Sequence, residues 1–158
     1  MFEMFKATIS KFKNSDENLK NEEIKNEEIK ALNSIVALLV EAASIDGNIG
    51  LDEKNQIKTI LTNHLNLETI KADEILEETI SNSSEQIEIW SKTNDIRKEL
   101  DYEERLNILE LMWEIVLVDD IIDVFEAQLM RRVSGLLYIS DIDSGNSKKR
   151  AIQKLKNN

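Results

Sequence analysis

The acidic residues best suited to bind a metal ion form a pattern that occurs twice. Within residues 41–53 and again within residues 114–126, a Glu, an Asp and a Glu are separated by five and seven positions. The matching pairs, 73 residues apart, are Glu41 and Glu114, Asp46 and Asp119, and Glu53 and Glu126. Divalent cations such as Ca²⁺ and Mg²⁺ take several oxygen ligands, which carboxylates and the free carbonyl groups at a helix end can supply. We therefore expect carboxylates from both copies to meet at one site for such a cation.

The same residues also fit a purely structural interpretation. Glu53 follows Gly50 by three positions, which is the spacing of a capping box at a helix N-terminus. Glu126 follows Asp123 by the same spacing. Asp46 stands directly before a glycine, which is an ordinary turn signal. Helix capping and metal binding are therefore alternative roles for these carboxylates.

The first residue of each copy has a different environment. Glu41 and Glu114 lie in strongly apolar segments. Each is expected to reach a backbone N–H or to pair with a base, for example Lys54 or Arg131. Neither copy is an EF-hand, because the carboxylates do not fall at alternate positions of a 12-residue loop.

The remaining reactive side chains do not indicate an enzyme. The chain has no cysteine, and His64 is its only histidine. No serine has a base in register with it, so a hydrolase triad is not expected. We expect His64 to lie at a helix end or on the surface, and Trp90 and Trp113 to be packing residues.

The elements that must position the acidic residues are all expected to be helices. Proline is absent and only four glycines occur, so long helices are favoured. Apolar residues recur at helical spacing, and no segment alternates as a strand would. Helices are expected at about residues 2–12, 22–45, 51–65, 68–80, 87–100, 101–118 and 124–137, then a polar break at 140–147 and a basic helix. Residues 1–20 form an amphipathic helix and linker in this interpretation, and residues 21–158 form an all-α, pseudo-symmetric domain.

The charge distribution restricts the class of partner. The formal net charge is −11. Residues 21–147 carry −17, whereas residues 148–156 hold five basic residues and no acid. A surface this negative repels polyanions, so nucleic acid is not expected as a partner. Metal cations or a basic protein surface are more compatible with this negative charge. The aromatic and lysine pattern of residues 2–12 suits a protein partner or peripheral membrane contact. No apolar run matches a membrane span or signal peptide, so we expect a cytoplasmic protein.

Four short segments resemble the TerB family of tellurite-resistance-associated helical proteins. They read AASIDGNI at 42–49, DYEERL at 101–106, LMWE at 111–114 and VDDII at 118–122. Their order and spacing carry the resemblance, which covers roughly residues 30–155. A similar fold occurs in the N-terminal cytoplasmic part of DjlA membrane co-chaperones.

The resemblance implies a compact, two-fold-like bundle of seven to eight helices. It also implies a divalent-metal site, whose positions in this chain are Asp46, Glu53, Asp119 and Glu126. The family has no accepted enzymatic reaction, and its members are associated with stress responses, metal sensing and membrane-associated complexes. We therefore expect a non-enzymatic module that binds a divalent cation weakly and contacts a protein partner. The alternative is a metal-free protein–protein or membrane-peripheral interaction domain.

Overall fold

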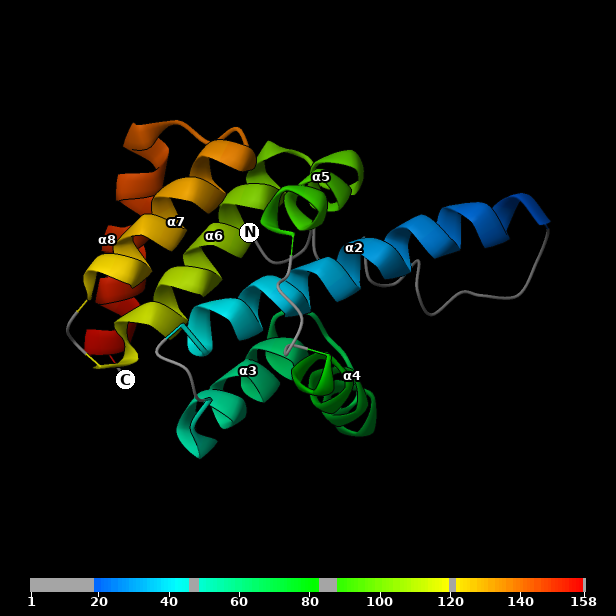
Figure 1. The fold of residues 1–158 in the computed structure, drawn as a ribbon, viewed down its shortest axis with the longest axis horizontal. Helices are drawn as coiled ribbons and strands as arrows, with labels where there is room; N and C mark the ends of the chain where they lie inside the picture. Colours follow the sequence, from blue (N-terminus) through cyan, green and yellow to red (C-terminus); the bar gives the residue numbers. More distant parts are fainter. Residues whose placement is uncertain (1–18, 46–48, 83–87, 120–121, 158) are drawn as a thin grey trace.

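A computed structural model describes residues 19–45, 49–82, 88–119 and 122–157 (Figure 1). For residues 19–25 and Asp119 it describes the backbone alone. The expected helix at residues 2–12 and the predicted ligand Asp46 lie outside these ranges. Within the described part of the chain, no helix is long and apolar enough to cross a membrane.

All regular structure in the described residues is helical, as the sequence predicts. Seven α-helices are joined by short connections, and a single 3-10 turn, η1, follows α6. The elements are α2 (Leu19–Ala43), α3 (Leu51–Asn63), α4 (Thr69–Ser81), α5 (Ile89–Glu99), α6 (Tyr102–Val116), η1 (Leu117–Asp119), α7 (Val124–Leu136) and α8 (Asp141–Lys156).

The duplication seen in the sequence is also present in the helix boundaries. Three boundaries in the second copy lie 73 residues after their counterparts. The pairs are the ends of α2 and α6 at Ala43 and Val116, the starts of α3 and α7 at Leu51 and Val124, and their ends at Asn63 and Leu136. The two helix–acidic loop–helix units are therefore structural repeats.

The repeat continues into a third helix, which the sequence analysis did not anticipate. Asn66 and Tyr138 are the only described non-glycine residues with positive φ, at 56° and 57°. Each follows a leucine without exposed surface, Leu65 or Leu137, and each turns the chain after its helix. Helices α4 and α8 then begin 72 residues apart. The repeated unit is thus α2–α3–α4 and α6–α7–α8, with α5 between the two copies.

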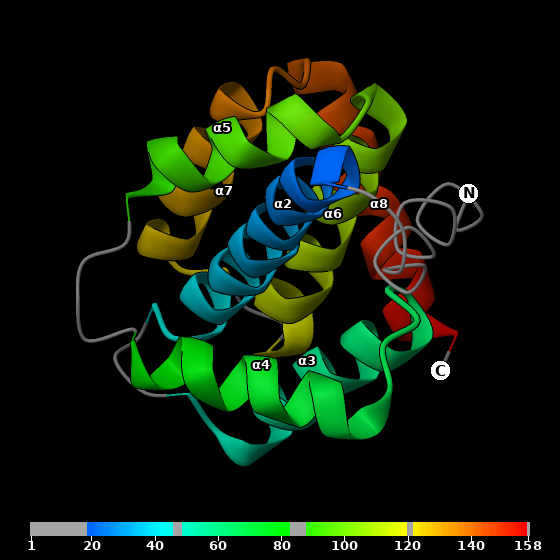
Figure 2. The same cartoon turned by 90° about the vertical axis from the view of Figure 1, so that its right-hand side faces the viewer.

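Helices α2 and α6 cross at the centre of the molecule. Figure 2 shows α3 and α4 on one side of this pair and α5, α7 and α8 around the remainder. The second half of α2, residues 31–43, and α6 from Leu106 on are buried nearly all round, which is typical of helix segments covered on every side. Val36 and Leu39 of α2 and Ile108 and Met112 of α6 have no exposed surface.

Two expectations were wrong. Trp90 is 59% exposed, because the buried face of α5 is the stripe through Ile89, Thr93 and Ile96, which leaves Trp90 on another side. The expected polar break at 140–147 is the first half of α8. The Ser140 hydroxyl accepts a hydrogen bond from the backbone N–H of Asp143 at 3.2 Å and caps this helix. The packing role expected for Trp113 is confirmed, since it is buried.

The left-handed conformation of Asn66 gives a test of the repeated turn. Asn66→Ala should lower the free energy of unfolding by about 1 kcal/mol, because an alanine Cβ is disfavoured at positive φ. Asn66→Gly should be nearly neutral, since glycine adopts this conformation readily. Urea unfolding of the three proteins measures the difference, and equal stability of the alanine and glycine variants would contradict the assignment.

Candidate functional site

The helix ends that border the two acidic loops lie at the same end of the molecule. In Figure 1, α2 and α6 both run toward the lower left, and α3 and α7 both begin there. A hydrogen bond joins the two copies: Gln56 Nε2 in α3 donates to the backbone carbonyl of Glu114 at 3.1 Å. Glu114 lies in the last turn of α6, where carbonyl groups lack a partner within the helix. The side chain of Gln56 therefore caps α6 and ties α3 to it.

The capping roles expected for Glu53 and Glu126 are confirmed. Glu53 Oε2 accepts from the backbone N–H of Gly50 at 3.0 Å, although Gly50 has no side chain to return the bond. Around α7 the exchange is complete. The N–H of Glu126 donates to Asp123 Oδ1 at 2.7 Å, and the N–H of Asp123 donates to Glu126 Oε1 at 3.3 Å. Both glutamates stabilise the first turn of a helix.

The four predicted metal ligands are only partly described. Glu53 and Glu126 lie in the equivalent first turns of α3 and α7. Asp119 is the last residue of η1, and only its backbone is described. Asp46 lies outside the described ranges. Among the described side chains, no group of three or more histidines and carboxylates is placed to hold a metal ion. The chemistry of the glutamates is compatible with one, because a carboxylate accepts several bonds and the capping bond uses one of them.

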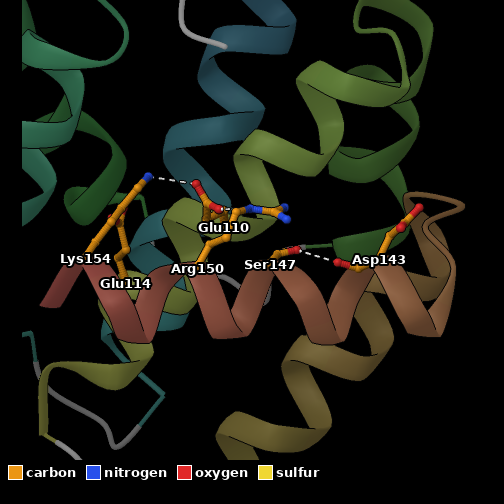
Figure 3. Close-up of polar contacts among 6 residues, drawn as sticks. All are labelled: Glu110, Glu114, Asp143, Ser147, Arg150 and Lys154. Atoms are coloured by element: carbon orange, nitrogen blue, oxygen red, sulfur yellow. Dashed lines mark hydrogen bonds and ion pairs between the residues drawn. The ribbon is translucent and has the colours of Figure 1, made fainter. Parts of the chain in front are cut away.

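A second charged group lies between α6 and α8 (Figure 3). The side chain of Glu110 is only 2% exposed, yet it meets two cations of α8. Its Oε1 lies 2.5 Å from Arg150 Nε, and its Oε2 lies 2.7 Å from Lys154 Nζ. Lys154 Nζ is also 3.7 Å from Glu114 Oε1. We call Glu110, Glu114, Arg150 and Lys154 the α6–α8 ion cluster.

Burial shifts the titration of two groups at this cluster. Desolvation raises the pKa of Glu114 above its ordinary value; Lys154 opposes the shift and the charge of Glu110 adds to it. His64, which directly follows α3, has a lowered pKa. The main cause is again desolvation, the charge of Lys154 adds to it, and Glu110 opposes it. Because His64 caps the end of α3, its expected helix-end position is confirmed. The charges of the ion cluster influence its pKa.

The sequence analysis missed the ion cluster. It expected Glu114 to pair with a base such as Lys54 or Arg131, whereas Glu114 meets Lys154. A signal was present in the sequence. The buried polar residues of α6 recur at helical spacing within an apolar helix, and Arg150 and Lys154 are four residues apart in α8. The buried polar residues of α6 are Glu104, Asn107, Glu110 and Glu114.

Comparison with known proteins gives one match. The model of the family described as tellurite resistance protein TerB matches residues 32–149, which is most of the chain. The match ends inside α8, before Arg150 and Lys154. No curated protein and no solved structure matches the chain.

The raised pKa of Glu114 predicts how its substitution changes stability with pH. The folded protein binds this proton more tightly than the unfolded chain does, so stability is lost as the pH rises from the ordinary value of 4.5 through the folded pKa. Glu114→Gln should therefore raise the melting temperature at neutral pH. The advantage should shrink as the pH falls through the folded pKa and should be absent below 4.5. A variant that melts lower than the parent at neutral pH would contradict this sign.

The contribution of His64 to stability should depend on pH in the opposite direction. Its lowered pKa means that the unfolded chain binds the proton more tightly, so stability is lost as the pH falls through the ordinary value of 6.5. His64→Gln should lose less stability than the parent between about pH 7 and about pH 5. Chemical unfolding at several pH values measures this, and parallel pH profiles for the two proteins would refute it.

Proposed function

This chain belongs to the TerB family, and we propose that it is a non-enzymatic module that binds a divalent cation weakly at its two acidic loops and contacts a protein partner. The loops in question are residues 44–50 and 117–123, between the paired helices. The single observation that supports a shared site best is the common position of the helix ends around them (Figure 1). The Gln56–Glu114 hydrogen bond links α3 to α6 at that end.

The ligand chemistry supports a hard cation. Glu53 and Glu126, with Asp46 and Asp119 from the adjoining loops, would supply carboxylate oxygens from both copies. A bound cation would neutralise acidic groups in the segment that carries most of the negative charge. The first turns of α3 and α7 already fix the two glutamates through their capping bonds, so little ordering of these side chains would be needed.

Exposed apolar side chains support a protein partner at the same end. Leu51 and Val124 are the equivalent first residues of α3 and α7, and they are 72% and 68% exposed. Phe125, beside Val124, is also 68% exposed. Apolar side chains flanked by carboxylates suit a partner surface that combines apolar and basic groups. The metal-free alternative uses such contacts alone, or a peripheral membrane contact through residues 2–12.

Calorimetric titration tests the cation site. The parent chain should release or absorb heat with Ca²⁺, Mg²⁺ or Mn²⁺ at concentrations up to millimolar, and its melting temperature should rise. The double variant Glu53→Gln/Glu126→Gln should bind at least about tenfold more weakly, since loss of metal-site partners costs this much. Glutamine keeps a carbonyl oxygen for each capping bond, so the helices should remain intact.

A matched control removes the same charge at the opposite end of the central helix. Glu103 and Asp141 are exposed acids in the first turns of α6 and α8. Glu103→Gln/Asp141→Asn should bind the cation as the parent does. Absence of both heat and thermal stabilisation in the parent would sink the cation site and leave the metal-free interaction domain.

A further inference from the structure

Helices α4 and α8 hold equivalent positions in the two repeats but are attached by different chemistry. Helix α4 buries apolar side chains, namely Ala72, Ile75 and Leu76. Helix α8 fully buries only Ser147 and Ala151, while Ile152 and Leu155 pack against the core with part of their surface exposed. Since apolar burial supplies most of the energy of helix packing, polar contacts contribute a larger share to the attachment of α8 than to that of α4.

Those contacts divide α8 into two halves. Near its start, the Tyr102 hydroxyl donates to Asp143 Oδ2 at 2.5 Å. Near its end, Arg150 and Lys154 form ion pairs with Glu110, as Figure 3 shows. Between them, Lys148 lies over the ring of Trp113, with Nζ 5.3 Å from the ring centroid. The C-terminal half of α8 is therefore held by cations together with the apolar contacts of Ala151, Ile152 and Leu155.

The fold does not require a carboxylate at position 110. Its counterpart 73 residues earlier is Ala37, which is buried in α2. Arg150 and Lys154 also lie beyond the residues that match the TerB family. The ion cluster is thus a feature of one repeat, and it makes the burial of Glu110 conditional on the attachment of α8, because a buried carboxylate without a partner is strongly unfavourable.

Helix α6 connects the ion cluster to the end of the molecule where the acidic loops begin. Lys154 lies between Glu110 and Glu114, which are four residues apart and repel each other without a cation. The backbone carbonyl of Glu114 accepts the hydrogen bond from Gln56 of α3. If Lys154 leaves, repulsion should loosen the last turn of α6 and, with it, the contact to α3. Among the described residues, His64 and Arg150 are further charged or titratable groups at this cluster.

We propose that the C-terminal half of α8 is an ionic latch whose attachment to Glu110 controls how firmly the last turn of α6 is joined to α3. Attachment neutralises both glutamates and stabilises the end of α6. Detachment returns Arg150 and Lys154 to solvent, hydrates Glu110 and weakens the Gln56–Glu114 hydrogen bond. Attachment of α8 and binding at the acidic loops are coupled in both directions. A ligand that binds at the acidic loops should therefore also favour the attached state of α8.

Amide hydrogen exchange of the full chain tests the latch. The variant Arg150→Gln/Lys154→Gln should exchange at least about tenfold faster than the parent in three segments. These are the second half of α8, the last turn of α6 with η1, and the first half of α3. The control Lys149→Gln/Lys156→Gln removes two exposed lysines of the same helix and should leave all three segments unchanged.

The outcomes separate the two parts of the proposal. Unchanged exchange in α8 would refute the latch, and faster exchange in α8 alone would refute its coupling to α3 and α6. Slow exchange in α2 serves as the check that the variant is folded. If the double variant does not pass it, the single variant Lys154→Gln, which leaves the Arg150–Glu110 pair in place, gives the comparison for the last turn of α6 and the first half of α3.

A second measurement rests on the proposed cation site. In a calcium titration, the latch variant should bind about threefold to thirtyfold more weakly than the parent and than the lysine control. Equal calcium affinity of the three proteins would refute an effect of the latch on the site. If the parent itself binds no calcium, the cation site fails, while hydrogen exchange still decides on the latch.

Discussion

The mutual burial of α2 and α6 is the constraint on which the rest of the structure depends. Residues 31–43 of α2 and most of α6 are apolar around most of their circumference, so other helices must cover the crossed pair where these segments meet. Helices α3 and α4 do this on one side, and α5, α7 and α8 do it on the other (Figure 2). Because α2 and α6 end in the same direction, the two acidic loops begin at the same end of the molecule (Figure 1). The candidate site is therefore a consequence of how the core packs.

Features that depend on neighbouring residues could be predicted from the sequence. The Asp101 capping box forms as its spacing indicates, with Asp101 Oδ1 accepting from the N–H of Glu104 at 2.9 Å. The starts of α3 at Leu51 and α7 at Val124 also fall where the sequence pattern places them. Features that depend on distant partners could not be predicted. The pairing of Glu110 with Arg150 spans 40 residues, and nothing close to Glu110 in the sequence identifies its partner.

The acidic loops illustrate the limit of motif spacing as an argument. The same three-residue separation satisfies a helix cap and supplies a metal ligand, since both require a carboxylate at the start of a helix. The structure assigns the capping role to Glu53 and Glu126. Coordination depends on where Asp46 and Asp119 direct their side chains, which is set by the loops and not by the spacing. A pattern of carboxylates thus identifies a location better than it identifies a ligand.

The unequal attachment of α4 and α8 also has a consequence for how the molecule responds to its surroundings. Apolar contacts such as those of Ile75 and Leu76 weaken on cooling and change little with dilute salt. The contacts of Arg150 and Lys154 respond to ionic strength. Helix α4 also carries an ion pair, Lys58–Asp73 at 3.1 Å, but this pair is partly exposed and contributes little to packing. Cooling should therefore weaken the attachment of α4 more than that of α8, and added salt should weaken the attachment of α8 more than that of α4.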